Sequence, residues 1–151
     1  ALIFLFVLSG CGIKNYDTTQ TKIIIIKSPK IKFADIGYIR NTNKAIELEL
    51  FIAGSPVEII TINTLICISA GCMSKGGFNG EYLHKNYPQE LLQNILLGSE
   101  IYNAKNKVQT HDGFEQKIQT EDVDINYRVD SKTIFFKDKK NNIIFKIKDT
   151  K

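Results

Sequence analysis

Residues 45–53 read AIELELFIA, and the alternation in this stretch indicates the fold class. Ile46, Leu48, Leu50 and Ile52 fall at every second position and are separated by other side chains, among them two glutamates. Successive side chains of a β-strand point to opposite faces, so this period of two predicts a strand with one buried and one exposed face. The chain is therefore expected to be a β protein.

The next stretch, residues 57–68, reads VEIITINTLICI and is apolar on both faces. A strand that is buried on both sides has this pattern. We expect residues 57–68 to form one strand at the centre of the core, after a turn at Gly54, Ser55 and Pro56.

Further strand-like segments are rich in β-branched or alternating apolar residues, and turn residues separate them. They lie at residues 22–27, 31–39, 108–110, 114–118, 123–129, 133–137 and 143–148, with Asp112-Gly113 as a hairpin turn. Residues 88–97 have helical spacing, with Pro88 in the first turn and Gly98 as the C-terminal cap. The pattern predicts a mainly-β, antiparallel β-sandwich over residues 22–151 with one short helix, immunoglobulin-like as the first choice and a small barrel as the second.

The chain has 151 residues, of which 43% are hydrophobic and 24% charged, as in soluble globular domains. These proportions exclude a chain that is disordered overall or that crosses a membrane many times. The net charge of +4 comes mostly from lysines scattered among 16 acidic residues. Because nucleic-acid-binding proteins cluster their charges and favour arginine, we expect no nucleic-acid partner. We interpret strand 45–53 and the lysine-rich hairpin 137–148 as exposed edges, where lysine opposes aggregation.

The first residues resemble the end of a bacterial lipoprotein signal peptide. An unbroken apolar run, residues 1–7, is followed by Leu8-Ser9-Gly10-Cys11, which matches the Leu-small-small-Cys lipobox. The pattern predicts that residues 1–10 are cleaved, that Cys11 carries a covalent lipid, and that residues 11–21 are a tether. The alternative is a short buried strand in a cytosolic protein. Gly12 in place of an aspartate favours the outer membrane, so we expect a lipid-anchored protein of the cell envelope.

Two cysteines remain after Cys11, namely Cys67 and Cys72. In an oxidising periplasm they are expected to form a structural disulfide. A metal or redox pair is disfavoured, because the spacing is not Cys-x-x-Cys and no histidine is adjacent. Two unpaired thiols are the remaining alternative.

No constellation of catalytic residues is evident, and we expect neither an enzyme nor a metal site. His84 and His111 lack metal-ligand spacing, and the glycines of the 69–87 segment do not match a phosphate-binding loop. That segment is the candidate binding loop, with Phe78, Tyr82, His84 and Tyr87 displayed on it. The alternative is that these aromatic side chains cover the junction between the helix and the sandwich.

The lipobox, the bias towards Ile, Lys and Asn, and residues 33–83, from FADIGYIRN through AGCMSKGGFNGEYL, resemble small lipoproteins of the Campylobacter and Helicobacter group. The resemblance covers most of the mature chain, and the lipobox is its one motif of known meaning. It implies a variant immunoglobulin-like β fold and an envelope location, and it transfers no catalytic residue.

Together these observations favour a non-enzymatic envelope lipoprotein that presents a β-sandwich for protein interaction, envelope structure or adhesion. A homodimer or another envelope protein is the expected partner, and the lipid on Cys11 is the expected link to the membrane. The alternative is a periplasmic ligand carrier or hydrolase that uses the 69–87 segment, with Glu81, Tyr82 and His84 lining a pocket.

Overall fold

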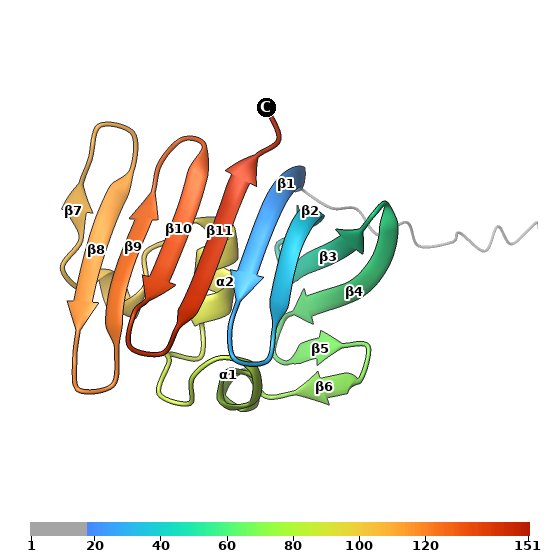
Figure 1. Ribbon diagram of the computed structural model, residues 1–151, viewed down its shortest axis with the longest axis horizontal. Helices are drawn as coiled ribbons and strands as arrows, with labels where there is room; N and C mark the ends of the chain where they lie inside the picture. The colour runs from blue at the N-terminus through green and yellow to red at the C-terminus, as the bar shows by residue number, and fades with distance from the viewer. Residues whose placement is uncertain (1–17) are drawn as a thin grey trace, which may run out of the picture.

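The computed structural model describes residues 18–151, where β-strands predominate (Figure 1). Six strands precede the helices: β1 (Thr18–Lys27), β2 (Lys32–Asn41), β3 (Ile46–Ile52), β4 (Ser55–Ile62), β5 (Ile66–Ile68) and β6 (Gly71–Met73). The helices are α1 (Lys75–Tyr82), α2 (Leu91–Leu97) and the short 3-10 helix η1 (Tyr102–Ala104). The strands that follow are β7 (Val108–Gln109), β8 (Phe114–Gln119), β9 (Asp124–Val129), β10 (Thr133–Asp138) and β11 (Ile143–Asp149).

The eleven strands of the described residues form one antiparallel sheet, in the order β6-β5-β4-β3-β2-β1-β11-β10-β9-β8-β7. The strands form two groups, β1–β6 before the helices and β7–β11 after them, and consecutive strands within each group are neighbours in the sheet. The groups are joined where β1 pairs with β11, from Lys22 opposite Asp149 to Lys27 opposite Ile144. The edges of the sheet are the short strands β6 and β7, and short edges limit pairing with another chain.

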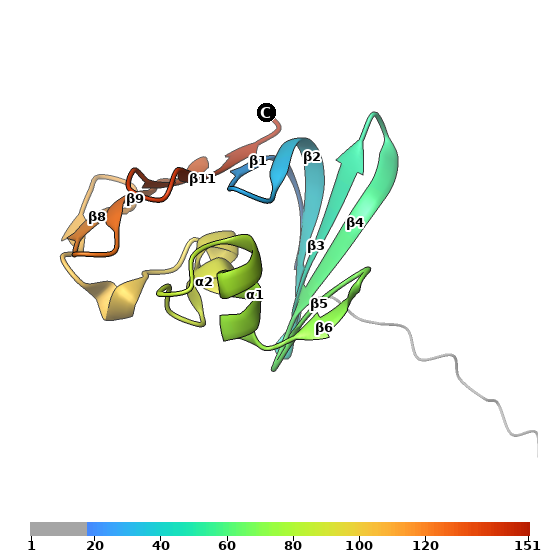
Figure 2. The same ribbon diagram turned by 60° about the horizontal axis from the view of Figure 1, so that its bottom comes forward.

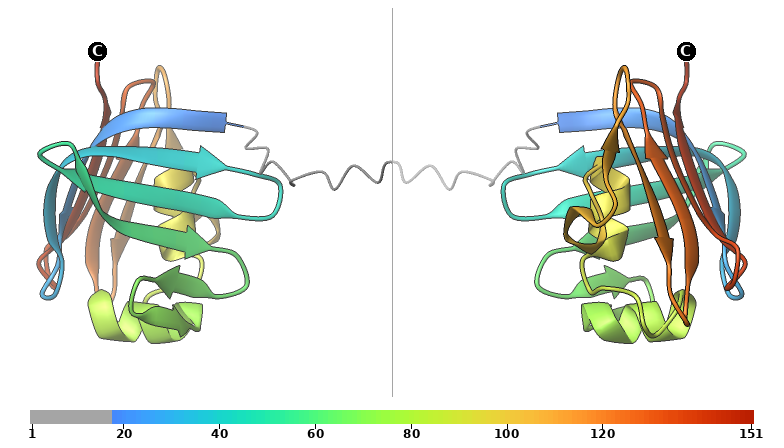
Figure 3. Two further views of the ribbon diagram at one scale, coloured as in Figure 1. Left: turned by 90° about the vertical axis from the view of Figure 1, so that its right-hand side faces the viewer. Right: turned by 90° about the vertical axis from the view of Figure 1, so that its left-hand side faces the viewer.

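The sheet bends strongly, and the helices lie on its concave side (Figure 2). In that view β3 and β4 stand at a steep angle to β8, β9 and β11, with α1 and α2 between the two halves. Figure 3 shows the same curved sheet from its two sides. One sheet therefore supplies two facing layers, and the helices fill the space between them.

The concave face of the sheet and the helices share one apolar core. Ile24, Leu48, Ile95 and Phe136 are each fully buried and come from β1, β3, α2 and β10. Burial of such side chains is the main stabilising contribution to folding.

The mainly-β, antiparallel, sandwich-like fold class predicted from the alternating segments is confirmed, since one bent sheet supplies two facing layers (Figure 2). The topology differs from the immunoglobulin-like arrangement, which has two sheets with Greek-key connections. Here each group of strands follows a meander within a single sheet. The sheet also stays open, because the edge strands β6 and β7 each pair on one side only among the described residues, so it is not the small barrel of the second choice.

Residues 57–68 form two strands, and the prediction of one doubly buried central strand is wrong. β4 ends at Ile62, and the Asn63 side chain accepts a hydrogen bond from the Leu65 N–H (3.1 Å) in the turn to β5. Val57 and Ile59 on β4 are 48% and 45% exposed. Their apolar side chains are therefore part of the surface, and β1 occupies the central position that was assigned to them.

Residues 18–151 contain two α-helices where one was predicted. The predicted helix 88–97 corresponds to α2, which starts later, at Leu91. It ends at Gly98, whose φ of 65° is the left-handed conformation of a glycine C-terminal cap.

The second helix, α1, lies in the segment that was expected to be a loop. Gly76, Gly77 and Gly80 lower its intrinsic helix propensity, which explains why the sequence did not predict it. Ser74 starts the helix, because its side chain accepts a hydrogen bond from the Gly77 N–H (3.0 Å).

One strand boundary and the position of two segments in the sheet also differ from the expectation. β1 begins at Thr18, opposite Asn41, so residues 18–21 belong to the sheet and not to the tether. Segments 45–53 and 137–148 are interior strands, since β3 lies between β2 and β4 and β10–β11 lie between β9 and β1. The interpretation of these segments as exposed edges is wrong.

Gly113 occupies the hairpin turn between β7 and β8 that Asp112-Gly113 predicts. A Cβ atom at Gly113 would lie 1.8 Å from the backbone oxygen of Val129 on β9. The position therefore needs glycine because a neighbouring strand approaches closely. At Gly80 in α1, by contrast, the nearest atom is the Cβ of Lys85, 3.9 Å away.

The substitution Gly113→Ala is expected to lower the free energy of unfolding by more than about 2 kcal/mol, because the backbone at Val129 must shift. Gly80→Ala is the matched control and is expected to raise it by about 0.5–1 kcal/mol, because alanine favours the helix. Urea unfolding measures both changes. Similar effects of the two substitutions would contradict the close approach at Gly113.

Candidate functional site

Most of the segment proposed as a binding loop, residues 69–87, is secondary structure packed against the sheet. Phe78 and Tyr87 are 2% and 5% exposed and belong to the core. The Tyr82 ring lies 4.9 Å from that of Phe78, and the His84 ring lies 5.4 Å from that of Tyr87. The aromatic side chains thus gather at the junction between helices and sheet, which is the packing alternative of the sequence analysis.

The three residues considered for carrier or hydrolase chemistry, Glu81, Tyr82 and His84, each interact with a different residue. The Lys30 ammonium donates to the Glu81 carboxylate at 2.5 Å. The Nδ1 atom of His84 accepts the N–H of Asn86 at 3.3 Å. His111 lies exposed in the turn before β8, as its position beside Asp112-Gly113 predicts.

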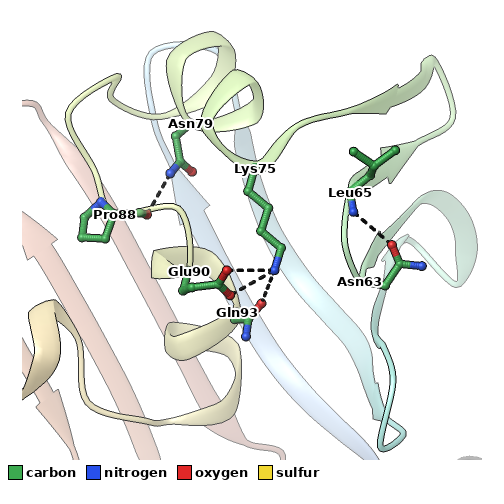
Figure 4. A network of polar contacts seen from close by, with 7 residues as sticks. All are labelled: Asn63, Leu65, Lys75, Asn79, Pro88, Glu90 and Gln93. Carbon is green, nitrogen blue, oxygen red and sulfur yellow. Dashed lines mark hydrogen bonds and ion pairs between the residues drawn. The ribbon is translucent and has the colours of Figure 1, made fainter.

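Polar contacts fix α1 against α2 (Figure 4). The Lys75 side chain is only 13% exposed and donates to both carboxylate oxygens of Glu90 (3.0 Å each) and to Gln93 (2.9 Å). The side-chain amide of Asn79 donates to the backbone oxygen of Pro88 at 3.0 Å. These bonds join the two helices into one unit, which covers the concave face of the sheet.

Asp138, at the end of β10, connects this unit to the sheet. Its buried carboxylate accepts hydrogen bonds from the Tyr87 hydroxyl (2.6 Å), the Asn141 amide (2.6 Å) and the backbone N–H of Asp124 (3.1 Å). Burial opposes ionisation, but these hydrogen bonds outweigh it and hold the pKa of Asp138 below its ordinary value. Burial, together with Asp138, raises the pKa of Tyr87, so its hydroxyl remains a donor.

Gln116, which was not among the predicted site residues, holds an unusual turn. Residues 102–104 have φ angles of 50°, 52° and 61°, a left-handed conformation that costs roughly 1–2 kcal/mol per residue. The Gln116 side chain is 1% exposed. It donates to the backbone oxygens of Ile101 and Lys105 (2.8 Å each) and accepts the N–H of Ile101 (2.9 Å). A glutamine at an inward position of an alternating strand is the signal that could have identified it.

The predicted pairing of Cys67 and Cys72 is confirmed, since their sulfur atoms are 2.08 Å apart. The two residues lie directly opposite each other on β5 and β6. The closed loop is small, so the disulfide contributes only about 2 kcal/mol on the chain-entropy account. It fixes the β5–β6 hairpin beside the start of the 69–87 segment.

An apolar groove of about 450 Å³ lies between β4 and this hairpin. Pro56, Val57 and Ile59 line it from β4, and Cys67 and Ile68 line it from β5. Its lining includes Ser69, the first residue of the 69–87 segment.

The groove exists because β4 and β5 diverge. β5 pairs with β4 only at Thr61 and Ile62, so in the described part of the chain the first half of β4 pairs with β3 alone. The Glu58 carboxylate accepts the N–H and the hydroxyl of Ser69, both at 2.8 Å. A strand edge flanked by apolar side chains can accept an extended peptide segment.

Comparisons with protein-family models, with curated proteins and with solved structures give no match. Within residues 18–151, no helix is long and apolar enough to cross a membrane. The same residues hold no group of three or more His, Cys, Asp or Glu side chains placed to bind a metal ion. Cys11 and the predicted signal segment 1–10 lie outside the described residues.

The carboxylate of Asp138 is expected to make stability depend on acid pH. Its pKa is lower in the folded than in the unfolded protein, so its contribution is present above the ordinary value of 3.8 and is lost as the pH falls below it. Asp138→Asn is expected to cost about 3 kcal/mol at neutral pH. It should also flatten the loss of stability in acid.

Chemical unfolding between pH about 6 and about 3 measures both effects. Asp122→Asn, at an exposed position in the turn before β9, is the control and should leave the profile nearly unchanged. An acid profile of Asp138→Asn that runs parallel to that of the parent chain would contradict the assignment.

Proposed function

We propose that this chain is a bacterial cell-envelope lipoprotein, anchored through a lipid on Cys11, whose β domain binds a protein partner and does not catalyse a reaction. The sequence Leu8-Ser9-Gly10-Cys11 after an apolar run carries the proposal. The small residues before the cysteine fit a signal-peptidase cleft, and the thiol accepts the diacylglyceryl group. Two or three acyl chains anchor a protein stably, since each buried CH₂ contributes about 0.8 kcal/mol.

The disulfide between Cys67 and Cys72 supports an exported domain. Such bonds persist in oxidising compartments, whereas thiols in the cytosol are kept reduced. Gly12, in place of an aspartate, favours the outer membrane as the destination.

A binding role is favoured by the distribution of polar and apolar groups in the described domain. The buried side chains of Asp138 and Gln116 form hydrogen bonds with turns and connecting segments, so these polar groups stabilise the fold. The groove at Val57 and Ile59 exposes apolar side chains beside an available strand edge. An extended segment of a protein partner fits this chemistry.

The lipid anchor is tested by expressing the chain behind a start methionine and a short basic segment in a Gram-negative host. Intact-mass analysis of the membrane fraction is expected to find a chain that begins at Cys11 and carries acyl groups. Cys11→Ala is expected to abolish both the acylation and the lipoprotein-type cleavage after Gly10.

The double variant Cys67→Ala, Cys72→Ala is the matched control, because it removes the other thiols and leaves the lipobox intact. It should retain the acyl groups. A chain that keeps residues 1–10, or one that is cleaved but carries no lipid, would refute the proposal.

A further inference from the structure

The outward face of the sheet carries a row of lysines in register. Because Phe136, Phe145 and Ile147 point into the core, the residues that alternate with them on β10 and β11 point outward. The cross-strand register places one outward residue from each of six strands side by side. In order from β2 to β8 they are Lys32, Lys27, Ile144, Lys137, Asn126 and Lys117.

The four lysines Lys32, Lys27, Lys137 and Lys117, here called the lysine row, span roughly 20–25 Å at the usual spacing between strands. Lys146 and Lys148 on β11 point to the same side. This face is seen in Figure 1, where β11 lies in front of α2. None of the described helices covers it.

The lysine row has no counter-charge in the described part of the chain. None of its members forms an ion pair there, whereas Arg40 on β2 contacts both Glu47 and Glu49 on β3.

Acidic side chains are scarce on the outward face of the six strands that carry the row. On β1, β2 and β8–β11, the outward acidic residues are Glu115, which pairs with Arg128 at 2.9 Å, and Asp124 at the start of β9. The lysine row is therefore a net positive strip that crosses six neighbouring strands, close to the turn between β1 and β2.

This arrangement is not explained by folding. Lys27 and Lys32 lie directly opposite each other, and like charges in that position are destabilising. Protection of a sheet edge does not account for them either, because β1, β2, β8, β10 and β11 are all interior strands. Because these like charges destabilise the fold, we look for their role in binding an anionic ligand.

We propose that the lysine row binds the anionic headgroups of a lipid bilayer, so that the sheet lies with its outward face on the membrane. The inference rests on the proposed lipid anchor in one respect, because the anchor would orient the sheet relative to the membrane. Cys11 precedes the start of β1 by seven residues, a reach of at most about 25 Å. Thr18 and Lys27 lie at opposite ends of β1, roughly 30 Å apart. The anchor at one end of this strand and the lysines at the other would together hold the outward face along the headgroups.

The chemistry of the face favours a bilayer over a nucleic acid. Six of the eight cations that point outward on these six strands are lysines, and both arginines, Arg40 and Arg128, are held in ion pairs with glutamates. Half-buried apolar residues lie between the lysines, namely Ile25, Ile144 and Phe135. Lysines on an apolar surface suit a membrane interface, where each near the surface adds to the attraction for anionic lipid. Nucleic-acid faces instead use arginine forks and stacked aromatic rings.

The test uses residues 12–151 without the lipid, a segment that contains every described strand and helix. Flotation is measured with vesicles of phosphatidylglycerol and phosphatidylcholine in equal parts, and with vesicles of phosphatidylcholine alone. The parent protein is expected to bind the anionic vesicles only, with an affinity that falls as salt is added. The variant Lys27→Gln, Lys32→Gln, Lys117→Gln, Lys137→Gln is expected to bind at least about tenfold more weakly.

The matched control removes four exposed lysines away from this face, Lys44→Gln, Lys85→Gln, Lys105→Gln and Lys151→Gln. It has the same net charge and should bind within about twofold of the parent. Thermal unfolding shows whether the variants fold. The lysine-row variant should melt no lower than the parent, since the repulsion between Lys27 and Lys32 is removed.

Three results would overturn the proposal: no binding of the parent to anionic vesicles, equal losses in the two variants, or tighter binding to a single-stranded oligonucleotide than to the vesicles. Acylation of Cys11 is measured separately by mass. Failure of the vesicle test therefore leaves the lipoprotein assignment standing, and failure of acylation leaves the vesicle result readable.

Discussion

Lys22 and Asp149 are 127 residues apart in the sequence, and their side chains form an ion pair of 2.5 Å between β1 and β11. Beside them, Ile24 pairs with Ile147, and both side chains are buried. This pairing of the first and last strands joins two meanders into one sheet. Without this pairing, β1 and β11 would each be an exposed, apolar edge strand, which is an aggregation hazard. Closing so long a loop has an entropic cost, which the buried pairs of β1 and β11 must offset.

Both faces of the sheet depend on this junction. On the concave side it brings β1 to β4 round the helices (Figure 2). The buried side chains of α2 thus share one core with residues from both halves of the sheet. On the outward side it makes the lysine row continuous, since Lys27 on β1 lies opposite Ile144 on β11. The buried polar residues Asp138 and Gln116 then hold the connecting segments in place. The same constraint thus supports the core and the surface to which we assign function.

The sequence pattern predicted the elements that depend on residues close to one another in the chain. Alternation identified β3, the turn at Asp112-Gly113 identified a hairpin, and Gly98 identified the end of α2. The pairing of Cys67 and Cys72 was predicted because they are the two cysteines that remain after Cys11 in a chain expected to be exported.

What the sequence did not predict depends on partners far away in the chain. Packing overrides the low helix propensity of the glycines in α1. The roles of Gln116 and Asp138 need the positions of Ile101 and Tyr87, and the lysine row appears only once the register of six strands is known. The aromatic residues of the 69–87 segment were assigned to a loop because nothing local distinguishes an aromatic side chain that binds from one that fills a core.

Native-state amide hydrogen exchange on residues 18–151, followed in increasing denaturant, tests the junction of β1 and β11 most directly. If the sheet is one cooperative unit, the amides of β1 and β11 exchange only through global unfolding, with the same free energy as those of β8 and β9. Two groups of amides, one from β1–β6 and one from β7–β11, with unequal opening free energies and with β1 and β11 exchanging early, would contradict the account.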